Sequence, residues 1–190
     1  MLESEYDEFA KRYDANYAKP EYINEDQELI AMISRFAIGR TLDIGCGTGL
    51  YLDYVKVPTD QYLGIDPSQG MLDKAVAKHP DHNFRKATLE EMNAFSDGQF
   101  NTLIALYGVA SYINPERYSL VTDLTKRGGT YFLMAYKDGY FPEFYTDEMK
   151  AHVKANADHA KLAELKGARQ FVFTNYLVTT NAVDDLGSAA

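Results

Sequence analysis

The sequence predicts an α/β fold in which a mostly parallel, doubly wound sheet carries helices on both faces. Short apolar runs alternate along the chain with segments of helical periodicity, as expected when a crossover helix follows each strand. With 190 residues and a hydrophobic content of 46%, the chain can bury one sizeable core but is short for two ordinary domains. We therefore expect a single domain over residues 1–190.

Apolar runs predict the parallel strands, which we expect near residues 41–45, 61–65, 82–86, 100–106 and 130–136. Helical patterns, several of them preceded by a capping residue, predict helices at about 24–38, 48–56, 68–78, 115–126 and 147–166. Within the single domain we expect an N-terminal helical cap or lid (1–38), a Rossmann-like core (39–182) and a flexible tail (183–190).

Both ends of the predicted core carry aromatic patterns. Tyr6, Phe9, Tyr13 and Tyr17 follow helical spacing and predict one leading helix with an aromatic stripe. The segment 169–180 is rich in Phe, Val, Tyr and Thr, and it is compatible either with one long strand or with a hairpin.

Three glycines, at positions 45, 47 and 49, directly follow the first predicted strand. Glycine has no Cβ and accepts positive φ, so glycines at alternate positions can form a turn whose backbone approaches a polar ligand closely. The next apolar run ends in Asp66, where an acidic residue can bind ribose hydroxyls. Together these features predict a nucleoside-containing cofactor. A dinucleotide-binding G-x-G-x-x-G motif would need glycine at position 50, which is leucine.

The segment from Asp43 to Gly49 resembles the first motif of the class I S-adenosylmethionine-dependent methyltransferases of the small-molecule type, an acidic residue followed by glycines at alternate positions. The resemblance continues through segments 64–68, 100–105 and 127–130, and it covers roughly residues 5 to 136. It implies a seven-stranded Rossmann-like sheet with an antiparallel closing strand. It also implies S-adenosyl-L-methionine as the cofactor and S-adenosyl-L-homocysteine as the product.

By this resemblance, the glycine turn passes the methionine part of the cofactor, Asp66 holds both ribose hydroxyls, and Met71 with Leu89 encloses the adenine. Many relatives carry an acidic residue where this chain has Thr88, so recognition of the adenine amino group can shift to the backbone or to Glu90. The candidate cofactor-binding residues are Tyr13, Tyr17, Asp43, Gly45, Cys46, Gly47, Asp66, Pro67, Met71, Thr88, Leu89, Glu90 and Leu106.

Methyl transfer from a sulfonium mainly requires alignment of the nucleophile, the methyl group and the sulfur, with reacting atoms about 3 Å apart. Tyrosines, not histidines, follow the fourth predicted strand, which favours an amine or a hydroxyl held by tyrosine or water as the acceptor. Tyr107, Tyr112 and Tyr136 are the candidate catalytic residues because each directly follows a strand end. Tyr140, Phe141, Phe144 and Tyr145 are further candidates for the acceptor pocket, but for Phe141 and Phe144 packing beneath the loop after the fifth strand is the favoured interpretation.

No residue is predicted to bind a metal. His152 and His159 stand seven residues apart on one predicted helix, a spacing more typical of a solvated face than of a metal site. Cys46 is the only cysteine, which excludes an internal disulfide and a cysteine-based zinc cluster.

Acidic residues outnumber basic ones by 28 to 19, for a formal charge of −9, and no Lys or Arg cluster could neutralise a row of phosphates. We therefore expect a small-molecule substrate, no nucleic-acid partner, and a monomer or homodimer. Residues 1–5 lack an apolar targeting core, and the apolar stretch around 103–110 is too short to span a bilayer. These features predict a cytoplasmic protein without a membrane partner.

The sequence is also compatible with other functions. A protein of the same fold could bind S-adenosylmethionine or S-adenosylhomocysteine without catalysis, which is compatible with the absence of a histidine after the fourth strand. An oxidoreductase would instead bind a nicotinamide cofactor. An aminopropyl-transferring relative would need acidic side chains around the acceptor, which the segment 107–112 does not supply.

Overall fold

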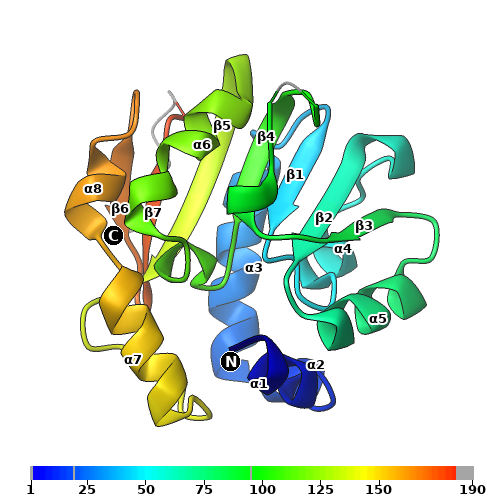
Figure 1. Ribbon diagram of the computed structural model, residues 1–190, viewed down its shortest axis with the longest axis vertical. Coiled ribbons are helices and arrows are strands. Elements are labelled where there is room, and N and C mark those ends of the chain that lie inside the picture. The colour runs from blue at the N-terminus through cyan, green and yellow to red at the C-terminus, as the bar shows by residue number, and fades with distance from the viewer. Residues whose placement is uncertain (1, 19, 95, 183–190) are drawn as a thin grey trace.

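The computed structural model describes residues 2–18, 20–94 and 96–182, so the predicted tail at 183–190 lies outside the described residues. Seven strands form one sheet in the order β3-β2-β1-β4-β5-β7-β6 (Figure 1). The strands are β1 (Thr41–Ile44), β2 (Tyr62–Asp66), β3 (Asn83–Lys86), β4 (Phe100–Ala105), β5 (Thr125–Tyr136), β6 (Arg169–Val172) and β7 (Tyr176–Thr180). The first five pair in parallel, and β7 pairs antiparallel with both β5 and β6. The predicted fold class is confirmed, and the segment 169–180 forms a hairpin.

The helices lie on both faces of the sheet and at one of its edges (Figure 1). They are α1 (Leu2–Phe9), α2 (Tyr13–Tyr17), α3 (Pro20–Ser34), α4 (Leu50–Tyr54), α5 (Gln69–Lys78), α6 (Ser119–Leu124), α7 (Asp147–Asn156) and α8 (His159–Ala163). Short 3-10 turns occur at η1 (Thr59–Gln61), η2 (Leu89–Glu91), η3 (Val109–Ser111) and η4 (Pro115–Arg117). Figure 1 shows α1, α2 and α7 at the lower edge, toward which the arrow of β5 points.

The sheet separates two apolar layers, as the alternation along β5 illustrates. Tyr131 and Leu133 pack in one layer with residues of α6 and α8. Phe132 and Met134 pack in the other layer with residues of α3, α4 and α7. Since successive side chains of a strand point to opposite faces, one strand contributes to both layers. The central strand β1 is buried along its whole length, which places its C-terminal end inside the molecule.

Several helix predictions need correction. The leading aromatic stripe spans two helices, α1 and α2, because the chain turns between Phe9 and Tyr13. The helix predicted at 24–38 begins earlier, at Pro20, and ends at Ser34. The segment predicted as a helix at 115–126 contains η4, the short α6 and the start of β5, which is longer than predicted.

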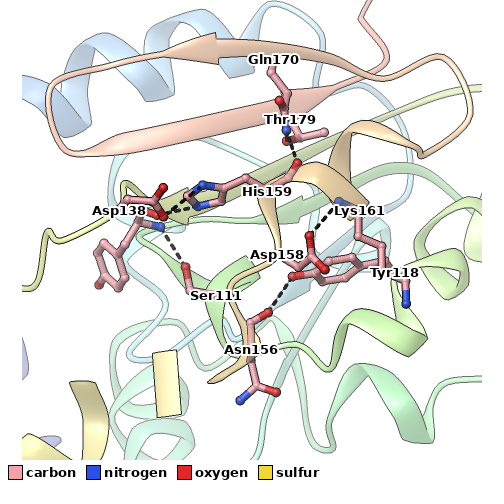
Figure 2. Close-up of polar contacts among 10 residues, drawn as sticks. Ser111, Tyr118, Asp138, Asn156, Asp158, His159, Lys161, Gln170 and Thr179 are labelled. Carbon is pink, nitrogen blue, oxygen red and sulfur yellow. Dashed lines mark hydrogen bonds and ion pairs between the residues drawn. The ribbon is translucent and has the colours of Figure 1, made fainter. Parts of the chain in front are cut away.

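The helix predicted at 147–166 is interrupted between Asn156 and His159, where side chains satisfy the exposed helix ends (Figure 2). The Asp158 carboxylate accepts a hydrogen bond from the Lys161 amide at 2.9 Å and so caps α8. The Tyr118 hydroxyl donates to the Asn156 carbonyl at 3.1 Å at the end of α7. His152 and His159 therefore lie on different helices, and the predicted common face does not exist.

Candidate active site

The glycine turn after β1 has left-handed backbone at each glycine, with φ of +64° at Gly45, +54° at Gly47 and +78° at Gly49. A Cβ added at Gly45 would lie 2.8 Å from the Cγ atoms of Val109, so this glycine permits close packing. At Gly47 the nearest atom outside the turn would be 3.9 Å away, on the Tyr13 ring. Gly47 thus presents bare backbone to the space beneath α2.

Asp66, the last residue of β2, is 8% exposed and held by two backbone amides. Its Oδ2 accepts from the Gly47 amide at 3.0 Å, and its Oδ1 accepts from the Ser68 amide at 2.8 Å. Burial raises the pKa of Asp66 from 3.8 to about 6, against the two hydrogen bonds, which lower it. The structure therefore ties this carboxylate to the glycine turn.

A cavity of about 400 Å³ opens beyond the C-terminal ends of the strands. Twelve of the sequence-predicted site residues line it, namely Tyr13, Tyr17, Gly45, Gly47, Asp66, Pro67, Met71, Thr88, Leu89, Glu90, Tyr107 and Tyr112. They come from α2 and from the segments after β1, β2, β3 and β4, which meet at this edge because the strands are parallel.

Four other predicted site residues lie behind the cavity wall. Asp43 accepts a hydrogen bond from the Tyr62 hydroxyl at 2.7 Å beneath the glycine turn, and burial raises the pKa of Asp43 to about 7. Cys46 is buried against Gly64, and burial raises the pKa of its thiol. Leu106 belongs to the apolar layer that α3 covers. Tyr136 is 1% exposed and supports the wall from behind.

Tyrosine hydroxyls form a continuous chain beside the cavity. Tyr6 donates to the Tyr112 hydroxyl at 2.9 Å and contacts the Tyr145 hydroxyl at 3.3 Å. The Tyr145 hydroxyl lies 2.8 Å from that of Tyr136, which donates to the Tyr107 carbonyl at 2.9 Å. Burial raises the pKa of Tyr6 to about 12 and also raises those of Tyr112, Tyr136 and Tyr145. These phenols therefore stay protonated at neutral pH.

The Tyr107 carbonyl, at the end of this hydrogen-bonded chain, belongs to a residue with strained backbone. Tyr107 has φ of +52°, which a bulky residue rarely adopts, and Gly108 follows with +84°. A Cβ at Gly108 would lie 2.2 Å from the Tyr136 ring, so only glycine fits there. His159 and Ser111 hold Tyr136 in turn, since a His159 ring nitrogen lies 2.8 Å from the Tyr136 carbonyl and the Ser111 hydroxyl accepts from the Tyr136 amide at 2.8 Å.

Two aspartates attach the leading helices to the core. Asp7 of α1 accepts from the Ser68 hydroxyl at 2.6 Å and from the Gly70 amide at 2.8 Å, at the start of α5. These hydrogen bonds lower the pKa of Asp7. Asp14 of α2 accepts from the Thr48 hydroxyl at 2.5 Å, within the glycine turn. Tyr6 of α1 and Tyr13 and Tyr17 of α2 line the cavity, so the two helices form part of its wall.

Sequence reasoning missed several lining residues, above all Tyr6, Asn114, His152 and Asn156. His152, on α7, stacks on Tyr112 with ring centroids 5.6 Å apart. The helical spacing of Met149, His152 and Asn156 contained a signal, because residues three and seven positions after a buried methionine share its side of the helix. Tyr145 lines the cavity as predicted, whereas Tyr140, Phe141 and Phe144 pack against the core and are not among the lining residues.

Within the described residues, no three His, Cys, Asp or Glu side chains gather in a way that could hold a metal ion. None of the helices described is both long and apolar enough to cross a membrane.

The strand order, the glycine turn after β1 and the buried aspartate that ends β2 define a class I methyltransferase. A family model described as "Methyltransferase domain" matches residues 41–129. The chain belongs to the class I S-adenosylmethionine-dependent methyltransferases, enzymes whose cofactor is S-adenosylmethionine, which confirms the resemblance. The site fits this cofactor, because bare backbone at Gly47, the Asp66 carboxylate and the apolar side chains of Met71 and Leu89 surround one cavity.

Solved methyltransferase structures share the fold. The DhpI–S-adenosylhomocysteine complex has a TM-score of 0.67 at 16% identity, over 94% of this chain and 93% of that one. The N-methyltransferase NodS from Bradyrhizobium japonicum WM9 has a TM-score of 0.64 at 11% identity, over 86% of this chain and 97% of that one.

A comparison of sequences corrects one expectation. An 18S rRNA (guanine-N(7))-methyltransferase of Bos taurus is 33% identical over 78 residues, which are 41% of this chain and 28% of that protein. The corresponding protein of Mus musculus is 32% identical over the same length. The chain thus spans about 28% of the length of the curated relatives it matches. The expectation of no nucleic-acid partner, drawn from the negative charge, is overturned by this likeness to enzymes named for an RNA substrate.

Proposed function

We propose that this protein transfers the methyl group of S-adenosylmethionine to a nitrogen or oxygen atom of a small-molecule acceptor by in-line displacement. The observation that supports the proposal is one cavity of about 400 Å³ that joins the glycine turn and Asp66 to a group of tyrosines. A cavity of this size, covered by α1 and α2, suits two compact reactants held side by side.

At the cofactor end, Asp66 binds both ribose hydroxyls, and the backbone at Gly45 and Gly47 passes the methionine part. Met71 and Leu89 enclose the adenine. Pro67, Thr88 and Glu90 complete the wall, and Tyr13 with Tyr17 covers the cofactor from α2. The cofactor supplies an electrophilic methyl group, so the protein mainly has to align the reactants and exclude water.

At the acceptor end, Tyr107 and Tyr112 contact the acceptor, while Tyr136 acts from behind as a positioning residue. Among the described residues that line the cavity, the ionisable acids are Asp66, Glu90 and the tyrosines, and none is Lys or Arg. Such a lining disfavours an anionic acceptor. Aromatic faces favour a cationic acceptor by roughly 0.5–2 kcal/mol.

The domain organisation belongs to the same proposal. Residues 39–182 form the catalytic core, and residues 1–38 form a cap whose Asp7 and Asp14 hold it over the bound cofactor. In such an arrangement the cap excludes water during transfer.

A second candidate acceptor is a guanine nitrogen of RNA. The identity of 33% to an 18S rRNA (guanine-N(7))-methyltransferase favours it. The matched segment covers only part of both chains, and the cap over the cavity would have to admit a base. This candidate therefore predicts a substrate with an unstacked guanine.

Labelled methyl donor tests these functions directly. Purified protein is incubated with methyl-labelled S-adenosylmethionine and with aliphatic amines, arylamines, phenols or ribosomal RNA, and label is followed into each acceptor. Label in an amine or phenol supports the main proposal, and label only in RNA supports the second. Calorimetric binding of S-adenosylhomocysteine without any transfer would instead support a non-catalytic binding protein.

A further inference from the structure

His152 lines the cavity from α7, a helix that contains none of the predicted cofactor-binding residues. This helix is anchored by Met149 and Val153, which are 3% exposed and packed in the core. The imidazole stacks on Tyr112 at an interplanar angle of 24°, and the Tyr6 hydroxyl fixes Tyr112 in turn. The ring is therefore held in place at the acceptor end of the cavity.

The other groups around the cavity are poorly suited to take a proton. In the proposed complex Asp66 holds the ribose hydroxyls, and both of its carboxylate oxygens also accept backbone hydrogen bonds, so it is not free to serve the acceptor. Burial keeps the phenols of Tyr6, Tyr112 and Tyr145 protonated, so they donate hydrogen bonds and do not act as bases. Glu90 is exposed and lies beside the Asn114 amide, 3.4 Å away, at the rim. A neutral imidazole, by contrast, always has one unprotonated ring nitrogen.

The charge of the cavity lining indicates which kind of methyl acceptor would lose a proton to His152. Tyrosine rings and two carboxylates, with no Lys or Arg among the described lining residues, favour a cationic guest. An aliphatic amine is such a guest in water, because it is protonated at neutral pH. Its nitrogen then has no lone pair and cannot attack a methyl group until it has lost a proton.

We propose that His152 accepts this proton and that the acceptor of the site is a basic aliphatic amine, an inference that rests on the proposed function. One N–H bond of the ammonium breaks, its electron pair stays on nitrogen, and the proton joins the imidazole. The nitrogen pair then forms the new N–CH₃ bond while the carbon–sulfur pair returns to sulfur, which becomes a neutral thioether. The product leaves as a methylammonium ion, and the imidazolium releases its proton to water.

Two amines of similar size separate this role from simple packing. A basic alkylamine needs deprotonation at pH 7.5, whereas an arylamine already carries its lone pair. We expect His152→Gln and His152→Asn to lower kcat/KM for the alkylamine about 100-fold, the lower end of general-base effects, and to change it less than about threefold for the arylamine. The alkylamine loss should lie mainly in kcat, since binding of the cation depends on the aromatic rings.

Two further measurements test the proposal without any turnover. Calorimetry should find unchanged S-adenosylhomocysteine affinity in both variants, which verifies the fold. With histidine ring nitrogens labelled by ¹⁵N, alkylamine binding to the protein loaded with S-adenosylhomocysteine should shift the His152 resonances and not those of His82. His82→Gln is the matched control, because His82 contacts the Val57 carbonyl outside the cavity, and it should keep full activity.

Equal losses for both amines, no loss in either variant, or unmoved His152 resonances would overturn the proposal while the proposed function stands. Label found in phenols but in no amine would also overturn it alone, whereas label found only in RNA would overturn it together with the proposed small-molecule acceptor. If the wild type binds S-adenosylhomocysteine but methylates nothing, the proposed function fails together with the inference.

Discussion

Asp66 combines deep burial with two backbone hydrogen bonds, so its carboxylate is fixed before any ligand arrives. We expect Asp66→Ala to weaken S-adenosylhomocysteine binding by about 1–3 kcal/mol, the scale of a lost charged hydrogen bond. Titration calorimetry measures the effect. Asp73→Ala is the control, because Asp73 is exposed on α5 and contacts only Gln69 among the hydrogen bonds described. An affinity within twofold of the wild type would remove Asp66 from the site.

The raised pKa of Asp66 predicts a pH dependence of binding. With a pKa of about 6, the carboxylate is mostly charged at pH 7.5 and mostly protonated at pH 5. Only the charged form accepts hydrogen bonds from both ribose hydroxyls, so affinity should fall as the pH drops from 7.5 to 5. Calorimetry across this range should give a flat profile for Asp66→Asn. A wild-type profile just as flat would contradict the role.

Asp43 predicts a pH dependence of stability instead, because it lies behind the cavity. Its folded-state pKa of about 7 exceeds the unfolded value of 3.8, so protonation favours the folded state. Its stabilising contribution is complete below about pH 4 and is lost as the pH rises through 7. Between pH 4.5 and 8, urea unfolding should show the wild type losing about 2–4 kcal/mol more than Asp43→Asn. Parallel pH curves would refute this.

At the scale of elements, Asp7 joins α1 to the start of α5 through two hydrogen bonds, of 2.6 and 2.8 Å. We expect Asp7→Ala to loosen the cap and to increase the dissociation rate of S-adenosylhomocysteine about tenfold, since hydrogen bonds to a charged group contribute about 1.5–3 kcal/mol. Stopped-flow measurements give the rate. Glu8→Ala serves as the control, because Glu8 is exposed and pairs with Lys11 on the same surface. Equal rates in both variants would mean that Asp7 does not hold the cap.

The sequence predicted those elements whose formation depends on neighbouring residues in the chain. The apolar runs became β1 to β5, and the glycines at 45, 47 and 49 all have the positive φ that their spacing suggested. The break between α1 and α2 escaped prediction, because Phe9 and Tyr13 keep helical spacing across it. The break before α8 has a local cause, the cap at Asp158, which a Asn-Ala-Asp sequence could have indicated.

The site was predictable where it follows strand ends and unpredictable where it depends on packing between distant segments. Asp66 and Tyr112 line the cavity as the strand ends implied. Tyr136 is the last residue of β5, but the turn at Tyr107 and Gly108 covers it. His152 reaches the cavity only because α7 packs beside η3, a contact between segments about 40 residues apart that no periodicity reveals.

For the whole molecule, ligand binding should appear as added stability. At 100 times its Kd, S-adenosylhomocysteine should stabilise the folded state by about 2.7 kcal/mol. For a protein of this size that corresponds to a rise in Tm of roughly 5–10 °C, measurable by differential scanning fluorimetry. A nicotinamide dinucleotide is the control and should leave Tm unchanged. The opposite pattern would favour an oxidoreductase.

The overturned expectation about nucleic acid also belongs to this scale. A formal charge of −9 describes the average field of the molecule, which governs steering and non-specific association. The choice of acceptor depends instead on the few side chains around the reacting atom. Relatives named for ribosomal RNA are therefore compatible with an acidic chain, and the acceptor has to be argued from the cavity.

Strand β7 lies between β5 and β6 in the sheet but follows both of them in the sequence, and this order matters for folding during synthesis. Synthesis delivers β5 and β6 before the strand that pairs with both of them. Until residues 176–180 are available, the backbone donors and acceptors at one edge of β5 lack their β7 partner. Such an unpaired edge can pair with other chains. A chain that ends before Tyr176 would keep this edge of β5 without its β7 partner, and we expect it to aggregate more readily than the full chain.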